Sequence, residues 1–297
     1  MNCLVTGGAG FIGSVLVDNL INKKHNVIVI DNESAEENEK FYWNDKADNY
    51  KYNICDYDAI FSLFENIDYV FHLAAQSRIQ PSIINPSYTI RVNSHGTENV
   101  LHASKENGVR KVIFSSSSSV YGMKNSVPHK EHMERDCLNP YAISKASGED
   151  LCIMYNKLYK LDVIILRYFN VYGKRQPTKG EFAPIIGRFL KLKNNNEKLT
   201  IVGDGSQKRD YTHVDDVIHA NILCMKNKKV GNGEIINIGS GENYNIKELV
   251  TLFNASYEFL PTRRGEAYET LSDINKAKEL LDWEPTIFLK DWLKAKV

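Results

Sequence analysis

The sequence predicts an α/β protein organised around a doubly wound parallel sheet, because short apolar, β-rich runs alternate with helical stretches through its first half. We expect strands at residues 3–6, 27–31, 50–54, 69–73, 112–115 and 163–166. Right-handed crossovers between these strands place helices on both faces of the sheet and gather ligand-binding residues at the strands' carboxyl ends. Residues 33–49 are polar and charged, and we expect a loop there with one helical turn at most.

The regular alternation ends after Arg167, where glycines and prolines separate short segments. We therefore expect a smaller C-terminal lobe to begin there, packed against the sheet domain with a cleft between them. A helix at 214–225 and a strand at 235–238 are expected to return to the large sheet, which makes the smaller lobe discontinuous. The predicted boundaries are 1–170 with 213–240 for the large domain and 171–212 with 241–297 for the smaller lobe.

The composition is that of an ordinary globular protein. The 297 residues are 42% hydrophobic, which is ample for one large or two modest packed domains. Lys and Arg number 37, as do Asp and Glu, so the net charge is zero and no global field attracts nucleic acid or an anionic membrane. No apolar run approaches the roughly 20 residues that span a bilayer, so we expect a cytoplasmic protein with no nucleic-acid or membrane partner. The five cysteines are scattered, and we expect free thiols and no metal site.

A glycine-rich turn links the first predicted strand to the following helix. Gly7, Gly10 and Gly13 stand three residues apart, so the backbone can bend at the first, approach a phosphate at the second and pack on the strand at the third. The helix start adds free N–H donors for a dinucleotide pyrophosphate. Eighteen residues beyond Gly13, Asp31 ends the second strand, where a carboxylate can bind ribose hydroxyls and repel a 2′-phosphate. The pattern predicts a Rossmann-type domain that binds NAD; the alternatives are a tight turn without a ligand and an aspartate that merely ends a strand.

Hydroxyl groups gather at the end of the fifth predicted strand, in the serine run 115–119. Asn139 and Pro140 are suited to start a helix, which puts Tyr141 and Lys145 one turn apart on the same face. The ordinary pKa of a phenol, about 10, must fall by about three units, worth roughly 4 kcal/mol, for Tyr141 to act as a base near neutral pH. The neighbouring ammonium and a positively charged nicotinamide ring are the expected causes. The alternative is an aromatic ring that packs beneath a lysine stem.

Further motifs extend along nearly the whole chain. They are Thr-Gly-Gly-Ala-Gly-Phe-Ile-Gly at 6–13, His-Leu-Ala-Ala at 72–75, Asn-Ser-His-Gly-Thr at 93–97, Ser-Val-Tyr-Gly at 119–122, Arg-Tyr-Phe-Asn at 167–170, Gly-Asp-Gly-Ser-Gln-Lys-Arg-Asp at 203–210 and Arg-Arg-Gly-Glu at 263–266. With these motifs the chain resembles the extended short-chain dehydrogenase/reductase family. Within that family it is similar to the NAD-dependent nucleotide-sugar 4-epimerases that act on UDP-glucose or UDP-N-acetylglucosamine.

The resemblance implies a role for each matching residue. Ser117 orients the substrate, Tyr141 is the catalytic base and Lys145 is its partner. The implied cofactor contacts are Gly7, Gly10, Phe11, Ile12, Gly13, Asp31, Asn32, Asn53, Ile54, Leu73, Ala74, Ala75, Asn93, Ser115, Tyr141, Lys145 and Tyr168. Asn53 departs from the acid that the family usually has near the adenine. The implied substrate contacts are Ser117, Asn170, Arg209, Tyr211, Arg263, Glu266 and Thr270, of which Asn170, Arg209 and Arg263 suit a diphosphate.

The reaction that the resemblance implies is transient oxidation at C4 of a UDP-hexose, followed by return of the hydride to the opposite face. Thr270 stands where relatives place a bulky aromatic or a small residue, so we expect UDP-GlcNAc and UDP-GalNAc to be accepted as well as UDP-Glc and UDP-Gal. Two alternatives, 4,6-dehydration and decarboxylation, use acids just before Val-Tyr-Gly, whereas this chain has Ser118 and Ser119 there. A non-catalytic NAD-binding sensor or scaffold is the alternative of another class.

The resemblance also implies a homodimer. Relatives commonly pair through a four-helix bundle made by the helix after Asn93 and the helix that carries Tyr141. Apolar residues on these helices could form the contact or could equally belong to the core: Val100, Leu101, Leu151, Cys152 and Tyr155.

Overall fold

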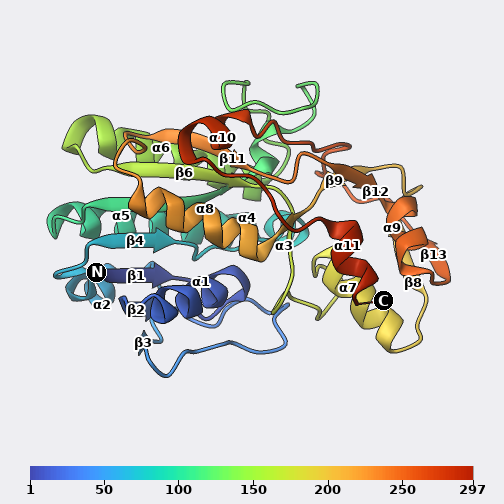
Figure 1. The fold of residues 1–297 in the computed structure, drawn as a ribbon, viewed down its shortest axis with the longest axis horizontal. Coiled ribbons are helices and arrows are strands. Elements are labelled where there is room, and N and C mark those ends of the chain that lie inside the picture. Colours follow the sequence, from blue (N-terminus) through green and yellow to red (C-terminus); the bar gives the residue numbers. More distant parts are fainter. Residues whose placement is uncertain (297) are drawn as a thin grey trace.

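The computed structural model describes residues 1–296, and its centre is a seven-stranded sheet in which every neighbouring pair is parallel (Figure 1). The strand order is β11–β6–β5–β4–β1–β2–β3. Their bounds are β1 (Asn2–Thr6), β2 (Asn26–Ile30), β3 (Asp48–Tyr50), β4 (Tyr69–His72), β5 (Lys111–Ser117), β6 (Val163–Tyr168) and β11 (Glu234–Ile238). This confirms the α/β fold class and puts the reversal of strand order between β1 and β4, where ligands bind in such sheets.

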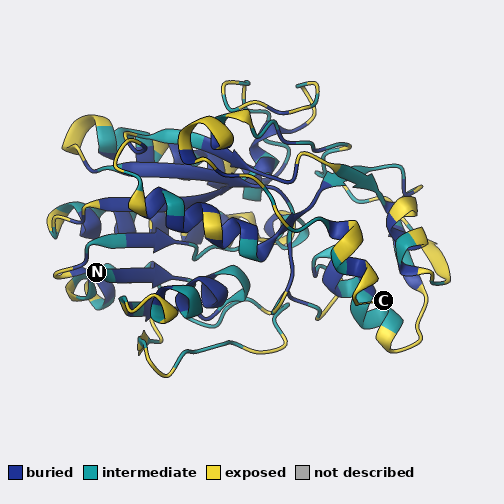
Figure 2. Ribbon diagram, in the orientation of Figure 1, coloured by how far each residue is buried: buried dark blue, intermediate teal, exposed yellow. Residues whose placement is uncertain are grey.

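Helices cover both faces of the sheet, so its inner strands are buried (Figure 2), whereas the edge strand β3 is exposed at Asp48 and Asn49. One face carries α1 (Phe11–Asn22), α8 (Val214–Lys226) and α10 (Asn275–Leu281). The other carries α2 (Tyr57–Phe61), α5 (Gly96–Glu106) and α6 (Pro140–Tyr159). Shorter helical segments connect these elements: Ser62–Phe64, α3 (Ile79–Ile84), α4 (Pro86–Ile90), Arg91–His95 and Ser118–Tyr121. Burial on both faces explains why the strands read as continuous apolar runs.

The smaller lobe contains three two-stranded ladders and three helices around its own apolar core. Its strands are β7 (Val171–Tyr172), β8 (Leu199–Val202), β9 (Lys208–Asp210), β10 (Thr212–His213), β12 (Asn243–Asn245) and β13 (Tyr257–Leu260), and its helices are α7 (Ile185–Asn194), α9 (Ile246–Phe253) and α11 (Leu289–Lys294). One predicted boundary differs, because Ala277, Leu281 and Trp283 pack in the core of the large sheet. Val297, the last residue of the predicted lobe, lies outside the described residues.

The third strand lies two residues earlier than the sequence pattern predicts and is only three residues long. It ends at Tyr50, and the next residues leave the sheet. Beyond the strand, the side-chain oxygen of Asn53 accepts a hydrogen bond from the Cys55 backbone N–H at 2.9 Å and closes a local turn. Asn53 and Ile54 therefore follow the strand instead of belonging to it.

The apolar residues suggested for a dimer contact lie inside the monomer. Val100, Leu101, Cys152 and Tyr155 are buried in the core between α5, α6 and the sheet, and Leu151 is half-buried against it. The two helices face the sheet with these side chains, so these residues cannot form the central contact between two subunits. A contact through α6 would use its exposed apolar residues instead, such as Ile143 and Leu158.

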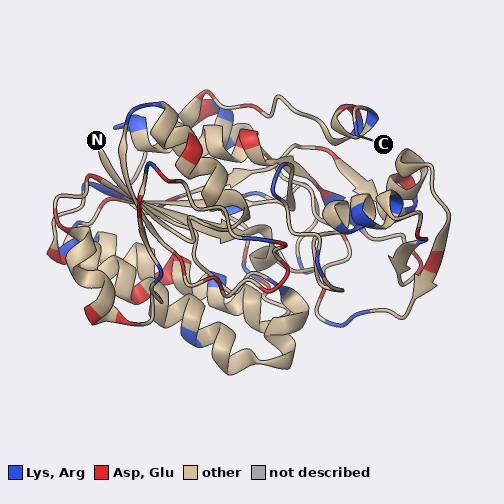
Figure 3. Ribbon diagram, turned by 90° about the horizontal axis from the view of Figure 1, so that it is seen from below, with Lys and Arg blue, Asp and Glu red and all other residues tan. Residues whose placement is uncertain are grey.

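Charged residues of both signs are interspersed over the helices and loops (Figure 3). Within residues 1–296, no helix is both long and apolar enough to cross a bilayer. The same residues contain no cluster of three or more His, Cys, Asp or Glu side chains placed to hold a metal ion.

His72 joins β4 to its neighbours through two hydrogen bonds. Its Nδ1 is 2.7 Å from Thr6 Oγ1 and its Nε2 is 2.9 Å from Thr97 Oγ1. Thr97 donates its hydroxyl proton to Asn93 O, so Nε2 donates to Thr97 and Nδ1 accepts from Thr6. A second ring proton would displace the hydrogen bond that Thr6 donates to Nδ1. Burial, with a smaller contribution from the charge of Lys145, lowers the pKa of His72 to about 3.

This histidine makes the fold sensitive to acid. Because its pKa is about 3 in the folded chain and about 6.5 in an unfolded one, only the unfolded chain gains the proton between these values, and stability is lost as pH falls below about 6.5. We expect His72 to account for about 2 kcal/mol of lost unfolding free energy between pH 7 and pH 5. Urea unfolding of the wild type and of His72→Gln at both pH values measures this. An equal loss in the two proteins would contradict the assignment.

Candidate active site

A cavity of about 490 Å³ lies where the carboxyl ends of the sheet meet the smaller lobe. With the exception of Asn93, every cofactor and substrate residue that the sequence analysis named lines this cavity. The volume is in the range of small-molecule and cofactor sites. One cavity therefore joins the predicted dinucleotide site, the Tyr141 region and the smaller lobe.

The glycine turn packs as tightly as its spacing predicts. Gly7 has a φ of +70°, and a Cβ added to it would lie 2.7 Å from Ala74 N; a Cβ on Gly13 would lie 2.1 Å from Gly7 O. At the start of α1, Gly10 provides no side-chain cap, so the first backbone N–H groups of the helix are left for a ligand. These features fit the pyrophosphate of NAD.

Asp31 binds the glycine turn from the next strand. Its Oδ2 accepts a hydrogen bond from Ala9 N at 3.1 Å, and its Oδ1 accepts one from Glu33 N at 2.8 Å. Burial raises the pKa of this carboxyl, and the backbone N–H groups counteract the change. Each oxygen retains a free lone pair, so the carboxylate can hold the turn and still accept a ribose hydroxyl.

Tyr141 and Lys145 lie on one face of α6 and contact the end of β5. The helix begins at Pro140, and Asn139 caps it by accepting from Ala142 N at 2.8 Å. Ser117, at the end of β5, lies near enough to the Tyr141 phenol to lower its pKa. Lys145 Nζ donates to the backbone oxygen of Ser115 at 2.8 Å. The serine, the tyrosine and the lysine that the sequence analysis grouped are therefore brought together.

The electrostatic expectation for Tyr141 requires a correction. Burial raises the pKa of its phenol, while the hydrogen bond from Ser117 and the charge of Arg78 lower it. The Lys145 ammonium donates to the backbone oxygen of Ser115, and burial lowers its own pKa to about 8. The sequence pattern does not identify Arg78, whose charge lowers the pKa of the Tyr141 phenol.

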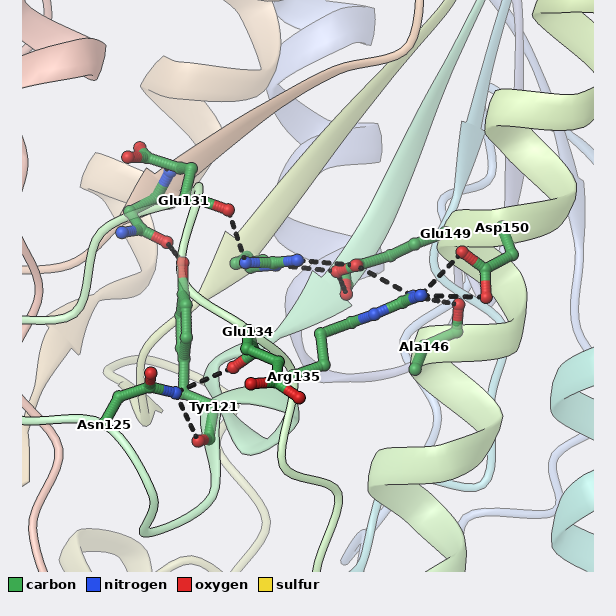
Figure 4. A network of polar contacts seen from close by, with 11 residues as sticks. Tyr121, Asn125, Glu131, Glu134, Arg135, Ala146, Glu149 and Asp150 are labelled. Atoms are coloured by element: carbon green, nitrogen blue, oxygen red, sulfur yellow. Dashed lines mark hydrogen bonds and ion pairs between the residues drawn. The ribbon is translucent and has the colours of Figure 1, made fainter.

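Glu149, one turn beyond Lys145, completes the contact between α6 and β5 (Figure 4). Its Oε1 accepts from Ser116 Oγ at 2.6 Å and from Arg167 Nε at 2.8 Å, and its Oε2 accepts from Arg167 Nη2 at 2.7 Å. The guanidinium of Arg167 also stacks over the Tyr121 ring at 4.7 Å. The side chains of Ser116, Glu149 and Arg167 are all buried, so each needs the others as its hydrogen-bond or charge partners.

A close approach between helix and strand makes these contacts possible. Gly148 faces the Phe114 ring, and a Cβ added at this glycine would lie 2.4 Å from Phe114 Cζ. A side chain at this position would push α6 away from β5. The distances from Tyr141, Lys145 and Glu149 to the strand end therefore depend on this glycine.

Tyr168 and Asn221 support the same strand end from β6 and α8. Ser115 Oγ donates to Tyr168 Oη at 3.1 Å, and Tyr168 Oη is 3.0 Å from Asn221 Oδ1. Burial raises the pKa of the Tyr168 phenol. This residue lines the cavity as the resemblance implies.

The implied substrate residues approach the cavity from the smaller lobe. Asn170 donates to Asp210 O at 2.7 Å and to Thr270 Oγ1 at 3.3 Å. Arg209 donates to the backbone oxygens of Lys208 and Tyr268, and Arg263 pairs with Glu181 at 3.0 Å. Tyr211 Oη is buried and has no hydrogen-bond partner within the described chain. An orphaned hydroxyl near Arg209 is what a polar ligand would satisfy.

Asn93 does not line the cavity. Its side-chain oxygen accepts from Gln76 N at 2.7 Å, and its amide nitrogen donates to Gln76 O and to Ser144 Oγ. It therefore ties the loop after β4 to α6. A direct cofactor contact from Asn93 is not supported, because its polar atoms are already used by the protein.

Other cavity residues were not named from the sequence. They include Arg78, Gln80, Glu181, Phe182 and Arg188. Arg78 and Gln80 follow the His-Leu-Ala-Ala motif directly. That position, just beyond a strand end that lines the cofactor site, is the signal that could have found them.

Comparison with known proteins agrees with this geometry. The NAD-dependent epimerase/dehydratase family matches residues 3–239. The chain belongs to this family. It is 39% identical to a putative UDP-glucose 4-epimerase of Methanocaldococcus jannaschii, covering 99% of this chain and 96% of the relative. It is 35% identical to a UDP-glucuronate 4-epimerase of Thermodesulfobacterium geofontis, covering 99% and 94%. A UDP-glucose 4-epimerase of Thermotoga maritima, solved with UDP-glucose, has a TM-score of 0.94 and 38% identity, covering 100% of this chain and 97% of that chain.

The contact between Glu149 and Arg167 can be tested in this family member by removing one charge. We expect Glu149→Gln to lower the unfolding free energy by about 3 to 5 kcal/mol, because Arg167 stays buried without a counter-ion. Asp150→Asn is the control: the neighbouring carboxylate binds Arg135 but is 61% exposed, so its loss costs under about 1 kcal/mol. Urea unfolding at pH 7 measures the unfolding free energy of both variants. Equal small losses would contradict a buried ion pair between Glu149 and Arg167.

Proposed function

We propose that this protein interconverts the C4 epimers of a UDP-hexose through a transient 4-keto sugar. The observation that carries the proposal is the convergence of Ser117, Tyr141 and Lys145 on a cavity shared by the glycine turn and the smaller lobe. The names of the relatives support the nucleotide-sugar class.

Each residue then has a separate task. NAD bound at the glycine turn supplies a hydride acceptor that becomes the donor in the second half of the reaction. Tyr141 takes the proton from O4 of the hexose and later returns it, and Ser117 positions that oxygen by hydrogen bonding. Lys145 fixes the strand end that carries Ser117. The cost of burying the phenolate is offset by Ser117 and Arg78, both of which lower its pKa.

Epimerisation also requires the hexose to present both faces while the nucleotide stays bound. Arg209, Arg263 and Asn170 surround the part of the cavity formed by the smaller lobe, where they would hold the diphosphate. The Arg263–Glu181 pair is available to open when an anion arrives. Tight binding at the diphosphate leaves the hexose itself free to turn.

The cavity offers no support for dehydration or decarboxylation. Within the described residues its acidic side chains are Asp31, Glu181 and Glu266, and none lies on the segment 115–122 beside Tyr141. Ser118 and Ser119 occupy that segment, and a hydroxyl cannot replace a carboxylate as a further acid or base near neutral pH.

Finer features of the proposal concern the sugar and the assembly. Thr270 lines the cavity, and its small side chain would leave room beside the hexose for an N-acetyl group. We therefore include UDP-GlcNAc and UDP-GalNAc among the substrates.

We also propose a cytoplasmic homodimer that takes part in polysaccharide biosynthesis. Sedimentation of the purified protein measures the mass of the assembly.

The proposal predicts a specific loss in Tyr141→Phe. Removing the phenol oxygen removes the base, so turnover of UDP-glucose and UDP-galactose should fall about 10²- to 10⁴-fold, while UDP binding is kept. Proton NMR of products from a UDP-sugar panel measures the activity. Tyr159→Phe, an exposed tyrosine of the same helix, is the control and should keep full activity. Wild-type protein that binds NAD and a UDP-sugar without converting any of the panel would support a sensor instead.

A further inference from the structure

Arg78 differs from the other basic side chains of the cavity. Five basic residues line it: Arg78, Lys145, Arg188, Arg209 and Arg263. The last four donate hydrogen bonds to backbone or carboxylate oxygens. Within residues 1–296 the Arg78 guanidinium makes neither a hydrogen bond nor an ion pair, and its Nε is shielded from solvent without a partner. Arg78 is half-buried, and a cation with a shielded, unpartnered N–H is a group that an anionic ligand would complete.

The position of Arg78 is fixed relative to Tyr141. Arg78 precedes α3, and its backbone oxygen accepts from Ser82 N at 3.2 Å. Ser82 Oγ in turn accepts from Tyr141 N at 3.1 Å. These two contacts join the backbone at the start of α3 to the first turn of α6, and the charge of Arg78 is near enough to lower the pKa of the Tyr141 phenol.

Nearby acids do not neutralise this charge. The carboxylate of Glu37 acts on Arg78 through space, but no carboxylate of the described chain lies within 4.0 Å of the guanidinium, as an ion pair would require. Burial lowers the pKa of Arg78, and Glu37 and Tyr141 counteract that change.

We propose that Arg78 binds an oxyanion on a ligand that reaches Tyr141, namely the C6 carboxylate of a nucleotide hexuronate or, as the other source, a phosphate of the dinucleotide. The inference rests on the proposed function. A guanidinium binds carboxylate and phosphate through two parallel hydrogen bonds. In a hexose, C6 is joined to C4 through C5 alone, so a cation beside the residue that acts on O4 can reach a C6 carboxylate. The pyrophosphate is expected at the start of α1, which favours the carboxylate.

Arg78→Gln tests the proposal, with Arg110→Gln as the matched control because its side chain is 70% exposed and pairs with Asp68 away from the cavity. Two sets of measurements are needed: kcat/KM and calorimetric Kd for UDP-glucuronate and UDP-glucose, and the Kd and content of bound NAD. If the carboxylate is the ligand, Arg78→Gln raises the Kd for UDP-glucuronate by about 10- to 100-fold and the Kd for UDP-glucose by less than about threefold. If a phosphate is the ligand, the Kd for NAD rises by about 10- to 100-fold and both sugars are affected equally.

Arg78→Lys keeps the charge but loses the paired donors, so its effect should lie between those of wild type and Arg78→Gln. This variant also serves if Arg78→Gln proves unstable in thermal unfolding. The proposal is overturned if both variants match Arg110→Gln in sugar discrimination and NAD affinity. Calorimetry keeps this result separate from the proposed function, because binding is measured even if neither sugar is epimerised.

Discussion

The contact between one face of α6 and the last three residues of β5 is the interaction on which the candidate site depends. Tyr141, Lys145 and Glu149 stand four residues apart. Lys145 donates to Ser115 O and Glu149 accepts from Ser116 Oγ, while Tyr141 lies near Ser117, which lowers the pKa of its phenol. Three successive turns of the helix therefore lie against the strand end. Since the reacting groups must be held within a fraction of an ångström, this contact between a helix and a strand positions Ser117 and Tyr141 better than loops could.

Two features maintain the contact between α6 and β5. Gly148 allows the helix to approach Phe114, and Arg167 on the neighbouring strand neutralises Glu149. Arg167 can do so because β6 pairs with β5 in a register that sets it opposite Ser116. A buried ion pair of this kind is weak evidence for stability, but its loss would leave a charge in the core. Its contribution is best understood as fixing one arrangement of the strand end.

The sequence predicts those parts of the site that depend on local spacing. The glycine turn, Asp31 and the pair Tyr141 and Lys145 are recognisable because short intervals place them on a turn, at a strand end or on one helix face. Glu149 and Gly148 become meaningful only when the partner of α6 is known. Arg78 lies in an irregular segment, where neither the helix period nor the strand period predicts which way its side chain points.

The errors have similar causes. β3 ends at Tyr50 and Asn53 forms a side-chain turn beyond it, which apolar patterning cannot reveal. Asn93 has the residue type of a ligand contact, but its hydrogen bonds are taken by Gln76 and Ser144. Val100 and Leu101 are apolar whether they face a core or a second subunit, and only their burial against the sheet decides between the two.

The central claim is that the hydrogen at C4 of the hexose is removed and returned within one cavity. The most direct measurement uses UDP-glucose that carries deuterium at C4, converted in ordinary water and analysed by NMR. The account predicts that the UDP-galactose formed retains the deuterium at C4. Product in which that deuterium has been replaced by hydrogen from the solvent would contradict it.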